Sequence, residues 1–303
     1  MSLHLRGIVA LLIVTMVWGT TFPAMKELTA YFPPVWIVFI RFATAGLLLS
    51  PLLLRARLRD LGIGLVLGCL LFVCFMFQLE GLALTSSNRN AFITGLNVLM
   101  VPLLGVAAGK LPERRIVIAV VMAIGGLFLL CWDDGDWSRG DTLALLGAFC
   151  FGGYVKLMEV GTRRASRLMT LTVTQILTVA LLAAIWLWLV EVPGGAIALK
   201  LDTHNYFKWV EEGIRLHWIN LAYLGLVATA AIISLQTWGQ HHASANEAAV
   251  IYAFEPACAA IAAYFWVGEA MTLWGILGAV LLIGGMIVSQ WQHASEKVLL
   301  VPD

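Results

Sequence analysis

The sequence predicts an all-α integral membrane protein with ten transmembrane helices, arranged as two five-helix repeats of inverted topology. Three observations predict this class: an apolar composition, ten long apolar runs, and sequence landmarks that recur at a near-constant offset. Hydrophobic residues make up 61% and charged residues 12% of the 303 positions, against roughly 45–50% and 25% in soluble domains. So few charges cannot cover a water-facing surface, so we expect the chain to lie in a bilayer.

The apolar runs give the individual spans. A transmembrane helix needs about 20 apolar residues to cross roughly 30 Å of hydrocarbon. Runs of that kind predict spans at 7–26, 34–54, 61–80, 91–109, 116–132, 142–159, 168–190, 218–238, 246–267 and 272–291. The connections are mostly short, so neighbouring helices are expected to be antiparallel.

Recurring landmarks divide the spans into two repeats. Gly19 and Arg41 in the first half correspond to Gly153 and Gln175 in the second, at an offset of about 134 positions. Later pairs, such as AFITGL with AAVIYA, are about 157 positions apart because the second half has an additional hydrophilic stretch at 191–216. We therefore assign 1–141 to the first repeat and 142–303 to the second.

Charges in the short loops predict the orientation. The loops at 55–60, 109–115 and 162–167 are basic and fall on one side, which places both termini in the cytoplasm of a bacterial cell with the protein in its inner membrane. The opposite side receives an acidic loop at 133–141, expected to be solvated, and the outside-facing loop at 191–216, expected to hold a short amphipathic helix. Five spans per repeat is an odd number, so the second repeat enters the membrane from the opposite face.

Inverted repeats are typical of secondary transporters, since two similar units inserted upside down can expose one central site alternately to either side. Other classes lack support. The net charge of +1 gives no basic stripe for nucleic acid, and the sequence has no G-x-x-x-x-G-K-[ST] motif, C-x-x-C pair or nucleophile elbow. The sequence therefore predicts no enzyme activity, cofactor or metal. The expected partners are a small-molecule substrate and membrane lipids, and both monomer and homodimer remain open.

Several motifs add a family resemblance. The first span contains WGTTF followed by Lys26, the second contains Arg41, and residues 253–285 combine E-P, G-E and a G-x-x-x-x-x-G-G ending. Over about 10–290 these features resemble the drug/metabolite transporter superfamily, specifically its EamA-type exporters. In the first half the chain departs from the pattern, because Leu99 stands near the place that corresponds to Pro256.

The resemblance implies export of amino acids, related metabolites or amphiphilic drugs, usually in exchange for protons. We expect a secondary active exporter of small amphiphilic metabolites, with amino acids as the first choice, that alternates access around a central cavity. The alternatives are a drug or organic cation efflux transporter and a flippase of a lipid-linked substrate.

Charged residues inside spans give the first candidate site residues, because a charge at a helix centre costs about 2.5–3.5 kcal/mol on insertion scales. Glu255 is the candidate for proton coupling. It could instead be a permanently ionised partner of Arg41 or a helix-capping carboxylate beside Pro256. Arg41 is a candidate for the cavity or for a structural role, and Lys156 is expected to extend toward the headgroups.

Prolines and isolated polar or aromatic residues complete the candidate set. Prolines break the helical hydrogen-bond pattern and could act as hinges or be tolerated kinks; they are Pro23, Pro102 and Pro256. Residues that could line a mostly apolar cavity with a few placed polar groups are Trp18, Thr21, Phe22, Gln78, Asn97, Tyr154, Gln175, Gln236 and Tyr252. Tryptophans near span ends are expected to form an interfacial belt instead, but Trp18 lies deeper.

Overall fold

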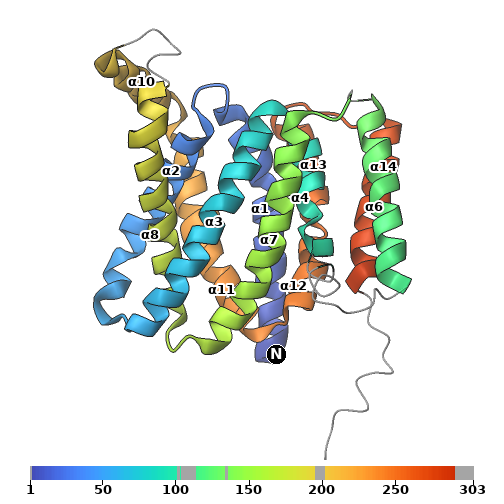
Figure 1. The fold of residues 1–303 in the computed structure, drawn as a ribbon, viewed down its shortest axis with the longest axis horizontal. Coiled ribbons are helices and arrows are strands. Elements are labelled where there is room, and N and C mark those ends of the chain that lie inside the picture. The colour runs from blue at the N-terminus through green and yellow to red at the C-terminus, as the bar shows by residue number, and fades with distance from the viewer. Residues whose placement is uncertain (1, 101–102, 104–113, 134–135, 195–201, 291–303) are drawn as a thin grey trace, which may run out of the picture.

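The protein is represented by a computed structural model that describes residues 2–100, 103, 114–133, 136–194 and 202–290. These residues fold as helices joined by short connections, with no β-strand among them. The helices are α1 (Leu3–Leu28), α2 (Pro34–Leu49), η1 (Ser50–Arg55), α3 (Leu58–Leu84), α4 (Ser87–Gly95), α6 (Arg114–Asp133), α7 (Arg139–Arg164), α8 (Leu168–Trp186), η2 (Leu187–Glu191), α10 (Thr203–Ala222), η3 (Tyr223–Ala231), α11 (Ile232–His242), α12 (Ala245–Tyr252), α13 (Glu255–Trp266) and α14 (Leu273–Gln290) (Figure 1).

Seven helical stretches of the described chain are long and apolar enough to cross a membrane. They agree with the predicted all-helical membrane fold. The predicted count of ten is not confirmed. The fourth predicted span lies partly outside the described residues, α6 is not among the seven stretches, and α14 contributes only a shorter apolar helix at Leu273–Val288. The inverted arrangement of two repeats also remains a prediction.

Polar residues set where the helices begin. Ser138 and Asp141 form a capping box at the start of α7, and Ser244 and Glu247 form one at the start of α12. Such pairs satisfy backbone N–H groups that have no partner within the helix. The Ser86 side chain accepts a hydrogen bond from the Arg89 N–H and so begins α4 before the predicted span at 91.

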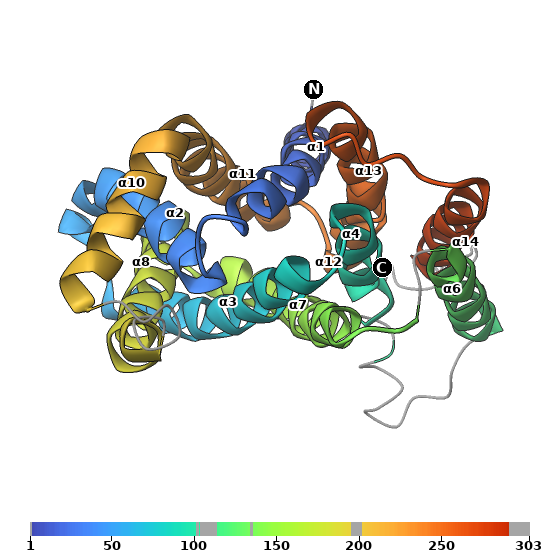
Figure 2. The ribbon, with the colours of Figure 1, turned by 90° about the horizontal axis from the view of Figure 1, so that it is seen from above.

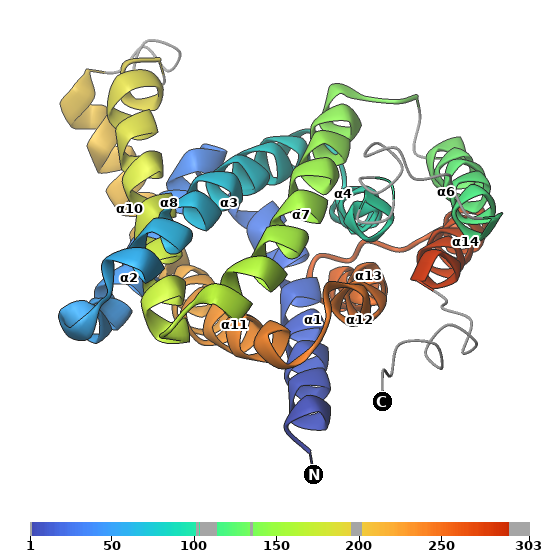
Figure 3. The same ribbon diagram turned by 60° about the horizontal axis from the view of Figure 1, so that its bottom comes forward.

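The helices pack into a layered bundle. The helix α3 runs along α7 and α8, and α1 contacts α11 and α13. The helix α4 lies between α7 and α13 (Figures 2 and 3). The helices α6 and α14 pack closely on each other to one side of the bundle, as seen from above in Figure 2.

Small residues make the α6–α14 contact possible. A Cβ atom added to Gly126 would lie 2.8 Å from the carbonyl oxygen of Gly278, so the two backbones touch there. Close approach of glycines is a common way for helices to pack in membranes.

The hydrophilic stretch at 191–216 differs in part from the expectation. Residues 195–201 lie outside the described chain, and from Thr203 onward the chain is helical through His242, well before the span predicted at 218. The helix α10 carries non-helical dihedral angles at His217 (φ −115°, ψ 21°). A kink therefore separates the amphipathic part of α10 from the apolar helix that follows.

Two helices contain π-helical turns. In η3, nine residues from Tyr223 to Ala231 adopt the wider π geometry between α10 and α11. A π-helix bonds each N–H five residues back and shifts the side-chain register relative to an α-helix. Apolar periodicity alone did not predict this segment, although it lies within the predicted span 218–238.

Candidate functional site

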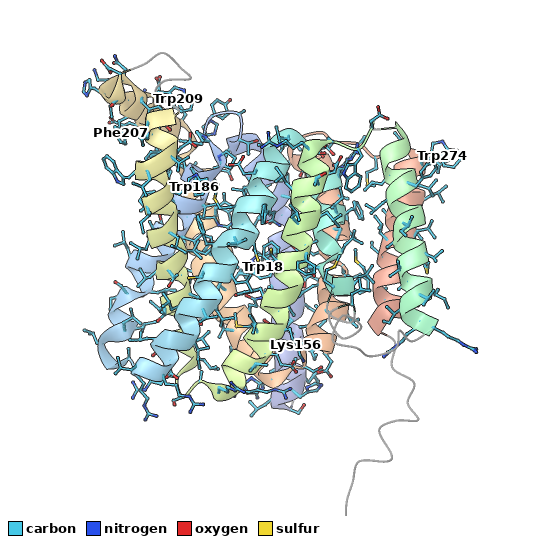
Figure 4. The ribbon with its side chains drawn as sticks, viewed as in Figure 1. Trp18, Lys156, Trp186, Phe207, Trp209 and Trp274 are labelled. Carbon is cyan, nitrogen blue, oxygen red and sulfur yellow. The ribbon has the colours of Figure 1, made fainter. Side chains whose placement is uncertain are left out.

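A cavity lies among the helices. It is bordered by α1, α2, α3, α4, α7, α11, α12 and the first residue of α13. The side chains around it are Trp18, Thr21, Arg41, Leu71, Phe75, Gln78, Thr94, Asn97, Phe151, Tyr154, Val155, Ile233, Gln236, Tyr252 and Glu255. Trp18 lies midway between the two ends of the bundle, whereas Trp186, Trp209 and Trp274 lie toward the end opposite the N-terminus (Figure 4).

Most residues singled out from the sequence meet at this cavity. They come from segments far apart in the chain: Trp18, Thr21, Arg41, Gln78, Asn97, Tyr154, Gln236, Tyr252 and Glu255. Two others lie outside it. Phe22 packs with Ala91 and Ala259, because it is one helical position beyond Thr21 and therefore faces another side of α1.

Gln175 is buried behind the cavity wall. Its Oε1 accepts a hydrogen bond of 2.8 Å from the hydroxyl of Tyr154. Its Nε2 donates to the hydroxyl of Thr237 at 3.5 Å, which is at the limit of a hydrogen bond. Gln175 thus orients a cavity side chain without lining the cavity itself.

Arg41 is the most enclosed charge of the cavity, with 1% of its surface exposed. Its Nε donates to Thr229 Oγ1 at 2.9 Å, and Nη1 donates to Met25 Sδ at 3.1 Å. The guanidinium carbon lies 4.8 Å from the centre of the Phe75 ring. Neither partner carries a negative charge.

Glu255 lines the same cavity but does not form an ion pair with Arg41. It is half-buried and is the first residue of α13, next to Pro256. Proline is well suited to the first turn of a helix, where its missing N–H is not needed. The ninth predicted span is therefore not one continuous helix, because α12 ends at Tyr252 and α13 begins at Glu255.

The three hinge candidates have different surroundings. Pro256 lies in the first turn of α13, directly after the interruption between α12 and α13. Pro23 lies inside α1, which continues as one helix through it. Pro102 lies outside the described residues.

Two polar atoms at the cavity are buried without a partner. They are the Tyr252 hydroxyl and Gln236 Oε1, neither of which meets the geometric criteria of a hydrogen bond to another described residue. The Tyr252 ring is 5.9 Å from the Trp18 ring, whose Nε1 donates to the carbonyl of Ala228 at 3.3 Å. Because buried polar atoms are nearly always hydrogen-bonded, these two are suited to contact a polar ligand.

The sequence analysis missed several residues of the site. Thr94, Phe75 and Phe151 line the cavity, and Thr229 holds Arg41. All four lie in apolar segments, where an additional aromatic residue or threonine does not indicate a binding site. Phe75 and Phe151 are recognisable only from their helical spacing to Gln78 and Tyr154, three positions further on.

A second polar group lies at the end of the bundle opposite the N-terminus, where α4 begins (Figure 1). We call Ser87, Asn88, Arg89, Asp141 and Glu269 the α4 cluster. The two carboxylate oxygens of Glu269 accept the backbone N–H groups of Ser87 and Asn88, each at 3.0 Å. Arg89 Nη2 lies 2.7 Å from Asp141 Oδ2, with both side chains almost fully buried. The solvated position expected for Asp141 is therefore wrong.

Asp141 is buried because it has several partners. It accepts hydrogen bonds from the Ser138 backbone and hydroxyl at 2.7 and 2.8 Å, and from the Thr85 hydroxyl at 3.2 Å. These donors compensate the Asp141 side chain for its loss of contact with water. The acidic composition of the loop concealed this role.

Comparison with known proteins agrees with the helical architecture. The sequence matches the EamA-like transporter family over residues 5–132 and 138–290. An uncharacterized transporter of Archaeoglobus fulgidus is 26% identical over 279 residues, covering 92% of this chain and 83% of that protein. The uncharacterized transporter YdfC of Bacillus subtilis is 23% identical over 279 residues, covering 89% and 86%. A crystal structure with 17% sequence identity superposes with a TM-score of 0.61 and covers 95% of this chain and 96% of its own, which shows a shared fold.

Proposed function

Because the chain belongs to the EamA-like transporter family, we propose that it is a secondary active exporter of small amphiphilic metabolites, with amino acids as the first substrate class. The observation that carries this proposal is the central cavity, which combines aromatic walls with Arg41 and Glu255.

Alternating access would move the substrate across the membrane. The family match in two segments, 5–132 and 138–290, supports two similar units, as the recurring landmarks predict. If the two units are inverted, an exchange of their conformations opens the cavity to the other side. The basic loops support an inner-membrane protein with both termini in the cytoplasm.

Proton coupling is assigned to Glu255. It is the only acidic side chain that lines the cavity in the described part of the chain. A carboxyl group at membrane depth can bind and release a proton as its surroundings change. Arginine cannot take this role, because it does not give up its proton under physiological conditions.

The aromatic walls also favour a second candidate, an efflux transporter of organic cations. Trp18, Tyr252 and Phe75 could surround a cation beside Glu255. The fixed positive charge of Arg41 in the same cavity opposes this candidate.

Reconstituted transport tests the proposal. We would measure uptake of radiolabelled amino acids and cationic dyes into proteoliposomes, with and without a pH gradient. Amino acids should accumulate only when a pH gradient is present. Accumulation of the dyes alone would favour the cation efflux candidate.

Glu255→Gln tests the coupling. The variant keeps the shape of the side chain and removes its titration, so it should abolish pH-driven accumulation and retain downhill exchange of substrate. Glu212→Gln, on an exposed position of α10, is the matched control and should behave as the wild type. If Glu255→Gln still concentrates substrate with only a pH gradient supplied, coupling lies elsewhere.

A further inference from the structure

The charge of Arg41 is buried without a compensating negative charge. Only 1% of its surface is exposed, and no carboxylate of the described chain forms an ion pair with it. A buried charge is normally paired or functional, because leaving water is costly. An arginine that lines a cavity and lacks an anionic partner is therefore available to an anion that enters the cavity.

The hydrogen bonds of Arg41 leave part of the guanidinium open. Nε is used by Thr229 and Nη1 by the sulfur of Met25, which is a weak acceptor. The structure records no hydrogen bond from Nη2 to a described residue, and this nitrogen is not among the fully enclosed unpartnered atoms. The Nη1 and Nη2 edge of a guanidinium can bind both oxygens of a carboxylate.

Thr229 fixes the direction of the guanidinium. The Thr229 hydroxyl donates its single proton to the carbonyl of Leu224, five residues earlier, at 2.7 Å. The oxygen can then act only as an acceptor toward Arg41 Nε. Both residues, Leu224 and Thr229, belong to the π-helix η3, and π-helical turns are frequent at functional sites.

We infer that the substrate carries a carboxylate that binds the guanidinium of Arg41, and that Thr229 of η3 is the positioning residue that orients it. This inference rests on the proposed function, because it names the substrate group that the same cavity recognises. A carboxylate fits better than a phosphate. Arg41 is the only cationic side chain that lines the cavity in the described residues, and Glu255 adds a negative charge, so a doubly charged anion would not be balanced.

Equilibrium binding to the purified protein in detergent tests the inference separately from transport. The probes are radiolabelled standard amino acids, the amines left when each loses its carboxyl group, and phenyl phosphate. We expect amino acids to bind and the matched amines and phenyl phosphate to bind at least about 10-fold more weakly, since a hydrogen bond to a charged group is worth about 1.5–3 kcal/mol. Equal binding of an amino acid and its amine would overturn the inference, and so would the lack of any amino acid that binds at millimolar concentration.

Substitution of Arg41 tests whether its guanidinium binds the carboxylate. Arg41→Gln should weaken amino acid binding by about 10- to 100-fold and leave binding of the matched amine unchanged. Lys208→Gln, on an exposed position of α10, is the control for loss of one positive charge and should bind as the wild type. An Arg41→Gln protein that keeps the affinity for amino acids contradicts the inference.

Substitutions of Thr229 by valine and by serine, which are close to threonine in shape, test its positioning role. Thr229→Val removes the hydroxyl at constant shape and should weaken amino acid binding by about 3- to 10-fold, with no change for the amine. Thr229→Ser restores the hydroxyl and should restore the affinity. If Thr229→Val weakens both probes equally, Thr229 supports only the packing of η3, and its positioning role is rejected.

The two proposals can fail independently. If amino acids bind in a manner that depends on Arg41 but are not moved across liposomes, the proposed function fails and the binding assignment stands. If liposomes accumulate amines as well as amino acids and Arg41→Gln has no effect, transport stands and the carboxylate assignment fails.

Discussion

Arg41 and Arg89 are buried to nearly the same extent but have different partners. Arg89, in the α4 cluster, lies 2.7 Å from the carboxylate of Asp141, and 3% of its surface is exposed. Arg41, at the cavity, is 1% exposed, and its hydrogen-bond acceptors among the described residues are a hydroxyl and a sulfur atom. Arginine thus forms an ion pair in the α4 cluster, whereas the arginine at the cavity has no carboxylate partner among the described residues.

The difference gives a physical criterion for separating the two roles. A buried charge that is fully paired makes the surrounding structure depend on it, because removal of one member leaves the other uncompensated. Removal of a buried charge whose partners are neutral leaves no uncompensated charge behind, so it should lower the free energy of unfolding less. The four predictions below test this contrast, in order of decreasing effect on stability.

The largest loss of stability is expected from Asp141→Ala. The change leaves Arg89 buried without its ion-pair partner and also removes the capping box of α7. Breaking a buried pair in this way costs about 3–5 kcal/mol. Equilibrium unfolding of the purified protein in mixed detergent measures the change in free energy.

The double variant Arg89→Met with Asp141→Ala is the control for this prediction. It removes both charges, so no buried charge remains uncompensated, and it should recover part of the lost stability. If the double variant is less stable than Asp141→Ala alone, the ion pair does not account for the loss.

A smaller loss is expected from Glu269→Gln. Its two carboxylate oxygens accept the N–H groups of Ser87 and Asn88, whereas an amide has one oxygen and would turn an N–H donor toward the second. The loss of one charge-assisted hydrogen bond at a half-buried position should cost about 1–2 kcal/mol. Equilibrium unfolding in mixed detergent again measures the change. The reference variant is Glu211→Gln, at an exposed position of α10. A Glu269→Gln protein as stable as this reference would show that α4 does not depend on the contact.

The sequence predicted the helices well because apolarity and helix ends are local properties. The length of the apolar runs indicated most helices, and Pro256 indicated that the helix is interrupted just before α13. The cavity was also largely predictable, since polar residues inside apolar spans are costly unless they face one another or a site. Gln78 and Gln236 are examples, as both line the cavity.

The remainder depends on three-dimensional contacts that a single sequence does not show. The role of Thr229 arises from the π-helical turn of η3, which changes the helical register and cannot be read from a period of 3.6 residues. Arg89 lies just before the span predicted at 91, but the cap at Ser86 places it inside α4. Its partner Asp141 is 52 positions away, so the acidic loop gave no sign of burial.

A charge pair with one exposed member provides the third prediction. Lys156 Nζ lies 2.6 Å from Glu159 Oε2, and about half of the Lys156 side chain is exposed. Figure 4 shows Lys156 toward the N-terminal end of the bundle. Lys156→Met should lower the free energy of unfolding by no more than about 1 kcal/mol, because an ion pair with a solvent-exposed lysine is worth little and Arg163 remains as a partner of the buried Glu159. A loss as large as that of Asp141→Ala would contradict the ranking of buried over exposed pairs.

Arg41→Met should have the smallest effect on stability, although Arg41 is buried almost as completely as Asp141. Methionine retains an unbranched side chain against Phe75. Thr229 keeps its hydrogen bond to Leu224, and Met25 loses only a weak interaction, so no charged partner is left behind. Replacing a buried charge by an apolar side chain is often neutral or stabilising, and we expect the free energy of unfolding to stay within about 1 kcal/mol of the wild type. The same protein should lose amino acid binding, as Arg41→Gln does. If Arg41→Met instead unfolds as readily as Asp141→Ala, Arg41 is a structural charge like Arg89, and the contrast between the two arginines is lost.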